Sequence, residues 1–438
     1  MGSKRIKVDW LARVEGEGAI DVEVEDGQVT RVQFAIFEPP RLFEAFLVGR
    51  TPDEVLDFVP RICGICPVAY QMSAAHAIEY AFGITVEGQL RALRRLLYCG
   101  EWIESHTLHV LMLAAPDFLG YDSVIGLAQD YPQQAHEALE LKRLGNDIVE
   151  TMGGREIHPV SVRTGGFYRV PTPGELRPLG ERLRSARAWA ERLVQWVAKL
   201  DLPAFPRDIE FVSLRHPDEY PMNEGRVVSS RGLDISMHEY DRYFEEIQVP
   251  YSTALQSVIR GRGAYFVGPL ARVNLNFDRL CPQAQAAAAA TGISFPSSNP
   301  FHSIVARALE VLHCVVEAEQ IIASYQQPAE PYVRFSPRAA AGEAITEAPR
   351  GMLYHRYQFD EHGYVQSARI VPPTAQNQRQ IEDDLRHYVP RVINLPLEQA
   401  TRRAEAAVRN YDPCISCSTH LLRLSNKAVQ KLQPFHSP

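Results

Sequence analysis

Two short segments at opposite ends of the 438-residue chain carry the side chains that soft metals prefer. Cys63 and Cys66 lie in the first segment, RICGICP, while Cys414, Cys417 and His420 lie in the second, DPCISCSTH. A Cys-x-x-Cys step lets two sulfur atoms point to one side of a tight turn, so two such steps together form a four-thiolate site. Thiolates select Zn, Cu, Fe or Ni over Mg or Ca. We therefore expect the fold to bring both segments to one metal site.

Two plainer interpretations of the cysteines compete with a catalytic metal. Structural zinc sites usually have their two cysteine pairs about 15–20 residues apart. Here the pairs lie at opposite ends of the chain, but spacing alone leaves zinc and a catalytic metal equally open. A Cys-Gly-Ile-Cys step is also typical of a thioredoxin-like dithiol, an interpretation that leaves Cys414, Cys417 and His420 without a role.

The residues after Cys66 predict a helix that begins at the first cysteine pair. Pro67 stands in the first turn, apolar residues recur between positions 68 and 81, and Gly83 supplies the stop. The positive end of a helix dipole favours a thiolate over a thiol. The predicted helix would therefore help the first pair to bind a metal.

Both segments resemble the two signatures of the large subunit of [NiFe] hydrogenases, Arg-x-Cys-Gly-x-Cys and Asp-Pro-Cys-x-x-Cys-x-x-His. Stretches between them are similar to further family segments: RVEG from Arg13, EPPRLFE from Glu38, GGREIHP from Gly153, APRG from Ala348 and VPPT from Val371. The resemblance covers nearly the whole chain. The sequences of the segments EPPR and CPVAYQM are most similar to those of the cytoplasmic bidirectional branch that works with NAD(P), often called sulfhydrogenases.

The resemblance implies a nickel–iron centre held by the cysteines of both segments. All of them would bind nickel. Cys66 and Cys417 would also bridge to an iron that carries carbon monoxide and cyanide, while Cys63 and Cys414 would be terminal ligands of nickel. The chain shows no further cysteine cluster and no dinucleotide fingerprint, so we expect no iron–sulfur cluster and no flavin in it.

The resemblance also implies roles for polar residues around this centre. Glu15 matches the glutamate that relays protons away from the terminal cysteine, and Asp412 matches a nearby carboxylate. Arg350 matches the arginine held over the open metal face, and Pro349 precedes it in the same cofactor-binding segment. Heterolytic cleavage of H2 needs a metal, a base such as a thiolate, and a carboxylate that moves the proton onward. Without the resemblance, an exposed turn residue is the favoured interpretation of Glu15, and Arg350 could equally be a surface residue.

A second, Mg-type ion is implied where the two ends of the chain meet. Glu44 and His420 match its side-chain ligands, and the carbonyl of Arg369 is a candidate third ligand. Glu44 lies in the apolar run FEAFL. Burying a carboxylate is costly unless it is paired or bound to a metal, which agrees with a ligand role.

Three positions depart from the family pattern. Tyr70 stands where many members carry a histidine that hydrogen-bonds a bridging sulfur, a bond that a phenol can also supply. Ser105 stands where some uptake-type members carry an acidic residue. After Pro372, Pro373 occupies the place of a cyanide-binding Ser or Thr, and Thr374 follows one residue late. Groups around the metal ligands orient these ligands and adjust the properties of the metal, so these departures are expected to alter that adjustment.

Composition and charge narrow the class of protein. The chain is 45% hydrophobic and shows no linker, so we expect a single domain over residues 1–438. Its net charge of −7 and scattered basic residues argue against a nucleic-acid partner. It has no apolar signal region and no run approaching ~18 apolar residues, so we expect no membrane segment and a cytoplasmic location.

Several residues that could act as ligands have plainer interpretations. Cys99, Cys281 and Cys314 stand alone and are interpreted as small buried apolar residues. His106 and His109 share one face of a predicted helix and are interpreted as core or interface histidines.

Helices dominate the elements that the sequence predicts. Helical spacing of apolar residues covers about 89–114, 132–152, 175–200, 304–322 and 397–408, and an alanine run covers 283–290. Alternating patterns predict β hairpins at about 6–37 and 351–373. The predicted fold class is mainly α, a large helical core with small β hairpins at its margins. Residues 421–438 form a tail of the kind that the family usually removes after the motif histidine.

The combined prediction is the catalytic subunit of a [NiFe] hydrogenase that oxidises H2 reversibly to two protons and two electrons. By resemblance, electrons would leave through an iron–sulfur small subunit and then through flavin and NAD(P) subunits. The alternatives are a non-catalytic scaffold subunit, like the complex I subunit that has lost the metal cysteines, and a zinc-stapled structural protein. The presence of all four cysteines weighs against a non-catalytic scaffold subunit. Finding nickel rather than zinc in the purified protein would exclude a zinc-stapled structural protein.

Overall fold

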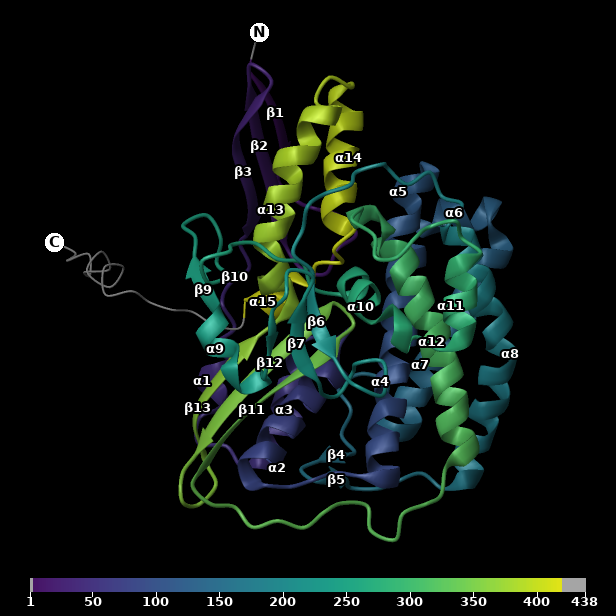
Figure 1. Ribbon diagram of the computed structural model, residues 1–438, viewed down its shortest axis with the longest axis vertical. Coiled ribbons are helices and arrows are strands. Elements are labelled where there is room, and N and C mark those ends of the chain that lie inside the picture. Colours follow the sequence, from purple (N-terminus) through teal and green to yellow (C-terminus); the bar gives the residue numbers. More distant parts are fainter. Residues whose placement is uncertain (1–2, 420–438) are drawn as a thin grey trace, which may run out of the picture.

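Long helices packed side by side form one side of the molecule (Figure 1). The structure, a computed structural model, describes residues 3–419. These helices are α4 (Gly88–Leu108), α7 (Pro132–Gly153), α8 (Pro173–Val197) and α12 (Ser303–Ser324). Helix α4 packs against α7 and α12, and α8 packs against the same two helices. The helical core predicted from apolar periodicity is therefore confirmed.

The regular α-helical hydrogen bonding of α4 stops at the C-terminal end of this helix. A π-helical turn at His109–Ala114 follows it and leads into α5 (Ala115–Leu119). Such turns interrupt the regular i→i+4 hydrogen-bonding pattern and are frequent at functional sites. This turn contacts α14 (Leu397–Arg409), so the helical core meets the C-terminal part of the chain here.

An antiparallel sheet packs against α3 (Pro67–Phe82), the helix that follows the first cysteine pair. Its strands are β11 (Ala340–Ala348), β12 (Gly351–Phe359) and β13 (Val365–Val371), in that order. The predicted hairpin at 351–373 corresponds to β12 and β13. Strand β11 was not predicted, because its sequence AAGEAITEA is rich in residues that strands disfavour.

A second three-stranded sheet lies near the N-terminus (Figure 1). It consists of β1 (Lys4–Val8), β2 (Gly18–Glu25) and β3 (Gln28–Ile36), with Asp26 and Gly27 in the turn of the predicted hairpin. Helix α13 (Pro373–Val392) packs against β3 and α14. It was not predicted, because polar residues such as Gln376 and Gln378 dominate its buried N-terminal half, although Ile381, Leu385 and Val389 recur at helical spacing in its second half.

Shorter elements complete the described residues. They are α1 (Phe43–Leu47), α2 (Pro52–Phe58), α6 (Val124–Asp130), α9 (Tyr240–Tyr243), α10 (Pro269–Asn276), α11 (Pro282–Ala289), α15 (Ile415–Ser418), β4 (Val162–Arg163), β5 (Gly166–Phe167), β6 (Val212–Arg215), β7 (Arg226–Ser229), β8 (Asp234–Ile235), β9 (Phe244–Gln248) and β10 (Leu255–Ile259). Strands β6 to β10 contribute to a smaller core beside the main one. Helix α11 confirms the prediction from the alanine run.

The solitary cysteines and the paired histidines lie mostly in the core. Cys99 and Cys314 are fully buried as expected, but Cys281 is partly exposed, because it directly precedes α11 at the rim of a surface cavity. His106 pairs with Glu310 over 2.9 Å, and His109 Nε2 lies 2.8 Å from the carbonyl oxygen of Arg409. Both histidines are therefore structural, as predicted.

Among residues 3–419, no single helix has the length and apolar character needed to cross a membrane. One bent pair of helical segments, Gly88–Leu119 and Val124–Asp130, meets the length and composition requirements only when the two segments are taken together.

Helices α4 and α7 approach each other closely at two glycines. A Cβ atom added to Gly145 of α7 would lie 2.6 Å from the carbonyl oxygen of Gly100 and 2.7 Å from the amide nitrogen of Glu104, both on α4. Neither backbone atom can move without shifting a helix. The crossing therefore depends on the missing side chain.

We expect Gly145→Ala to lower the free energy of unfolding by about 1–3 kcal/mol, since the added methyl overpacks this crossing. Guanidinium denaturation followed by circular dichroism measures the change. Gly174→Ala, in the first turn of α8, is the matched control, because its added Cβ meets nothing closer than 3.8 Å. Equal stability of the two variants would contradict the close crossing.

Candidate metal centre

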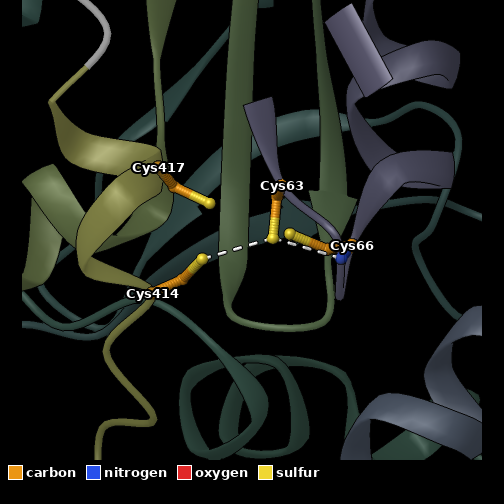
Figure 2. A group of neighbouring side chains, drawn as sticks. All are labelled: Cys63, Cys66, Cys414 and Cys417. Atoms are coloured by element: carbon orange, nitrogen blue, oxygen red, sulfur yellow. Dashed lines mark hydrogen bonds between the residues drawn. The ribbon is translucent and has the colours of Figure 1, made fainter. Parts of the chain in front are cut away.

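The fold brings the two Cys-x-x-Cys steps face to face (Figure 2). Cys63 follows the 3₁₀ turn Val59–Ile62, Cys66 directly precedes α3, Cys414 directly precedes α15, and Cys417 lies within α15. Their four sulfur atoms lie within 4.8 Å of one another, and those of Cys63 and Cys414 are 3.3 Å apart. All four side chains are buried. The expected meeting of the two segments is thus present in the structure.

The sulfur atoms are too close to be ionised together without a cation. The hydrogen bond with Cys414 contributes most to a pKa of the Cys63 thiol well below its usual value. Burial raises the pKa of Cys414 and of Cys417 well above the usual value. The protein alone therefore stabilises one thiolate at the expense of the others, because like charges repel strongly in a buried site. Full ionisation requires a thiophilic metal ion, which this donor set fits.

The first cysteine pair is held by hydrogen bonds from the backbone and from α4. The amide groups of Ile65 and Cys66 each donate to Cys63 Sγ over 3.3 Å. Glu101 of α4 accepts from the amide groups of Val68 and Ala69, at 2.6 Å and 3.1 Å. These are first-turn amides of α3, which have no partner inside the helix. Glu101 therefore fixes the start of α3 just after the cysteines.

Glu101 was not singled out from the sequence. The signal that could have identified it is a glutamate inside the apolar stretch YCGEWI of a predicted core helix. Burial raises the pKa of this carboxyl well above its usual value, so burying its charge is unfavourable.

Glu15 lies directly beside the second cysteine pair. Its backbone carbonyl accepts from the amide of Ile415 over 2.9 Å. Its Oε2 atom accepts from the amide of Ser416 at 3.0 Å and from the Cys414 thiol at 3.1 Å. Burial, followed by the negative charge of Cys63, raises the pKa of the Glu15 carboxyl. A carboxyl with a raised pKa in contact with a sulfur is suited to accept a proton from it and to release that proton again.

Gly16 permits this contact. Its φ of +85° is in the left-handed region, and an added Cβ would lie 2.8 Å from the Ile415 side chain. A side chain at this position would push Glu15 away from α15.

Arg350 and Asp412 form a buried pair next to the sulfur atoms. Arg350 Nε donates to the Asp412 carbonyl oxygen at 2.8 Å, and Nη2 donates to Asp412 Oδ1 at 3.1 Å. Burial lowers the pKa of the guanidinium, but Asp412 and the sulfurs of Cys414, Cys66 and Cys63 outweigh it and raise that pKa overall. Arg350 Nη1 is buried and has no hydrogen-bond partner among the described residues. Buried donors are normally satisfied, so a ligand at this site is expected to accept from it.

The remaining cofactor-binding candidates surround the same site in different ways. Thr374, in the first turn of α13, accepts a 3.0 Å hydrogen bond from the Cys414 amide, and Pro372 is the N-cap of that helix. The Pro349 carbonyl accepts from Arg272 over 2.9 Å. The buried Tyr70 hydroxyl has no hydrogen-bond partner among residues 3–419. Burial, followed by the negative charge of Cys417, raises the pKa of this phenol, which therefore remains a hydrogen-bond donor.

Of the predicted magnesium ligands, only Glu44 and Arg369 can be placed. Glu44 is buried, and its Oε1 accepts from the Ile370 amide at 2.7 Å, beside the Arg369–Ile370 peptide. His420 lies outside the described residues, as does the tail at 421–438. The carbonyl of Thr419 accepts from the Arg41 amide at 2.7 Å, so the chain reaches this region just before His420.

Two residues of the EPPR segment support the second cysteine pair and had no predicted role. Arg41 Nη2 donates to the carbonyl of Ile62 at 2.7 Å and also to that of Ser416. Glu38 accepts from the hydroxyl of Ser416 at 3.0 Å. Arg41 therefore cross-links the backbones next to both cysteine pairs.

Comparison with known proteins identifies the family to which this arrangement belongs. Residues 41–137 and 264–420 match the family model described as nickel-dependent hydrogenase. The chain belongs to the nickel-dependent hydrogenase family. The four buried cysteines of the two Cys-x-x-Cys steps lie in the matched residues, so the candidate centre and the family assignment coincide.

Known hydrogenases resemble this family member along almost its whole length. It is 34% identical over 423 residues to sulfhydrogenase 1 subunit alpha of Pyrococcus furiosus, covering 96% of this chain and 98% of that subunit. It is 25% identical to the beta subunit of the NAD-reducing hydrogenase HoxS of Cupriavidus necator, with 96% and 95% covered. Its fold matches a crystal structure of an NAD+-reducing [NiFe]-hydrogenase with a TM-score of 0.87 at 29% identity, covering 95% of this chain and 99% of the other.

These similarities make the chain a catalytic large subunit of a [NiFe] hydrogenase, an oxidoreductase that acts on H2. The non-catalytic scaffold and the zinc-stapled protein are not favoured. The predicted mainly helical fold is likewise that of the family.

We expect Cys414→Ser to lose bound nickel and all H2 turnover, because a hydroxyl is a poor replacement for a thiolate at a soft metal. Elemental analysis of the purified protein measures the nickel. Cys281→Ser is the control, since Cys281 stands apart from the four-sulfur group and should leave the nickel content unchanged. Full nickel content and activity in Cys414→Ser would exclude Cys414 as a ligand.

Proposed function

We propose that this subunit converts H2 reversibly into two protons and two electrons at a nickel–iron centre held by Cys63, Cys66, Cys414 and Cys417. One observation carries the proposal: four buried sulfur atoms lie within 4.8 Å of one another, and a carboxylate touches one of them at 3.1 Å. Four thiols alone would suit several metals. The carboxylate adds the proton acceptor that cleavage of H2 requires.

The residues around the sulfur atoms fit such a centre. When bound, the nickel–iron group, with carbon monoxide and cyanide on the iron, supplies the Lewis acid that polarises the H–H bond and takes up its electrons. The buried Arg350 Nη1 and the buried Tyr70 hydroxyl are hydrogen-bond donors that lie next to the four sulfur atoms and have no partner within residues 3–419. A cationic donor and a neutral donor are what bound anionic diatomic ligands and thiolates need.

Glu15 is proposed to carry the proton. Cys414 Sγ and Glu15 Oε2 already share a hydrogen bond, so a proton on this sulfur can pass to the carboxylate without a rearrangement. The Ser416 amide holds the same oxygen in place at 3.0 Å. The raised pKa of Glu15 brings its proton affinity closer to that of a thiol, which favours transfer in both directions.

Arg350 is proposed to hold its guanidinium beside the sulfur atoms as a fixed positive charge. Two hydrogen bonds to Asp412 prevent its rotation. Because the pair is buried, its field on the centre is little screened by water. The two residues thus act as one unit.

Electrons are proposed to leave through partners of this subunit. The related proteins are alpha or beta subunits of larger hydrogenases, and two of them are described as NAD-reducing or NAD+-reducing. By this similarity, an iron–sulfur small subunit accepts the electrons, and further iron–sulfur, flavin and NAD(P)-binding subunits lie beyond it, in the cytoplasm. A Mg-type ion bound by Glu44, His420 and the Arg369 carbonyl would join the two ends of the chain.

Glu15→Gln should slow proton transfer while leaving the centre assembled, because the amide keeps the size and can still accept from the Ser416 amide. We expect H2/D2O isotope exchange to fall by about 10²- to 10⁴-fold, the range for loss of a positioned acid–base group. Mass spectrometry of the gas phase measures it. Unchanged exchange would remove Glu15 from the proton route, and loss of nickel would make its role structural.

Infrared spectroscopy of the protein isolated from its native host tests the identity of the centre. We expect narrow bands from metal-bound carbon monoxide and cyanide, in a region where protein does not absorb. A full metal load without these bands would refute the nickel–iron assignment and point to a plainer ion.

A further inference from the structure

A carboxylate outside the metal centre binds arginines from both ends of the chain. Asp117 lies in α5, and only 6% of its side chain is exposed. Arg409, the last residue of α14, donates from Nε and Nη2 to the two Asp117 oxygens, each over 2.8 Å. Arg13 donates from Nη2 to the same carboxylate. Charge-assisted bonds of this kind are roughly twice as strong as neutral ones.

The same arginines also bind backbone carbonyl groups. Arg13 Nη1 donates to the Leu113 carbonyl over 2.7 Å, within the π-helical turn. Arg409 Nη1 donates to the Ala12 carbonyl over 3.0 Å. The N-terminal segment, the π-helical turn and the end of α14 are therefore cross-linked around one carboxylate. We call Asp117, Arg13 and Arg409 the arginine clamp.

The arginine clamp stands immediately before both partners of the proposed proton transfer. Arg13 precedes Glu15 by two residues, and Arg409 precedes Cys414 by five. Arg13 has a φ of 59°, in the left-handed region that residues other than glycine rarely adopt. Such a backbone persists when surrounding contacts hold it, and here the clamp supplies them.

We propose that Asp117 is a positioning residue that sets the distance between the Glu15 carboxylate and the Cys414 sulfur. It acts through Arg13 and Arg409, each of which leads directly into one of the two segments. The contact that it controls is short, 3.1 Å between Oε2 and Sγ. A displacement of about 1 Å can cost ~10²-fold in rate. The inference rests on the proposed proton relay through Glu15.

The surroundings of the clamp make it suitable for substitution. It borders a surface cavity of about 430 Å³ whose lining includes Asp117, Asp122 and Arg402. A neutral side chain at position 117 can therefore be solvated from this cavity, and the arginines can turn toward water. Asp117→Asn should weaken the clamp without collapsing a core.

The test compares Asp117→Asn with the unaltered protein in its assembled, metal-loaded complex. We expect H2/D2O isotope exchange to fall about tenfold, with nickel content and infrared bands unchanged. A second readout needs no H2, namely hydrogen exchange of the Ile415 and Ser416 amides. These donate to the Glu15 carbonyl and Oε2 at 2.9 Å and 3.0 Å, and their exchange should speed up about tenfold.

Two further variants separate the clamp from general effects. Asp122→Asn removes a neighbouring carboxylate that is 86% exposed and pairs with Arg402 at 3.1 Å, and it should change neither readout. Arg13→Lys should reproduce the effect of Asp117→Asn, and the double variant should be little worse than either, since residues in one network are not additive.

Wild-type amide protection at Ile415 and Ser416 together with wild-type isotope exchange in Asp117→Asn would overturn the inference. Loss of nickel in that variant would also overturn it, because Asp117 would then be needed for assembly. If Glu15→Gln leaves isotope exchange unchanged, the proton relay itself fails. The amide readout still decides whether the clamp positions Glu15.

Discussion

Four sulfur atoms packed within 4.8 Å of one another in a buried site repel one another as soon as more than one is ionised. The rest of the structure holds them there until a metal offsets that repulsion. Backbone amides donate to Cys63, Thr374 accepts from the amide of Cys414, and Arg350 places a positive charge beside the set. The amides belong to the first Cys-x-x-Cys step itself, whereas Thr374 and Arg350 come from other parts of the chain. The motif therefore supplies the ligands, and the surrounding fold helps to hold them close together.

The supporting groups come largely from the helical core. Glu101 of α4 fixes the start of α3, and Arg272 of α10 binds the carbonyls of Ala348 and Pro349 at 2.8 Å and 2.9 Å. Arg272 is itself held by Glu310 of α12 at 2.7 Å. Buried ion pairs of this kind add little stability overall, yet they define one arrangement of the loops that they bind. The helices thus act as a rigid frame for a site built on loops.

The sequence predicts the metal ligands better than it predicts the helices and strands that support them. Two cysteine pairs, and Glu15 and Arg350 by resemblance, could be identified because their residue types and spacing are rare. Strand β11 could not, since alanine and glutamate make up most of it. Helix α13 was missed because glutamine and asparagine fill its buried N-terminal half, although apolar residues at helical spacing follow in its second half. Glu101 and Asp117 were missed for a related reason: their importance depends on partners far away in the chain, Val68 and Arg13 among them. A local pattern can mark a residue as unusual, as for the glutamate inside YCGEWI, but it does not show which distant residue the side chain contacts.

The order of the ligands along the chain has a consequence for biosynthesis. Cys63 and Cys414, which touch in the folded protein, are separated by 351 residues. At roughly 5–20 residues per second, a ribosome completes the first cysteine pair about 20–70 s before the second. During that interval the first two thiols are present without their partners, and a chain that ends before Cys414 cannot carry the complete site. Assembly of the centre therefore has to wait until the second cysteine pair has been made, and that later segment then completes a site to which the earlier segments contribute.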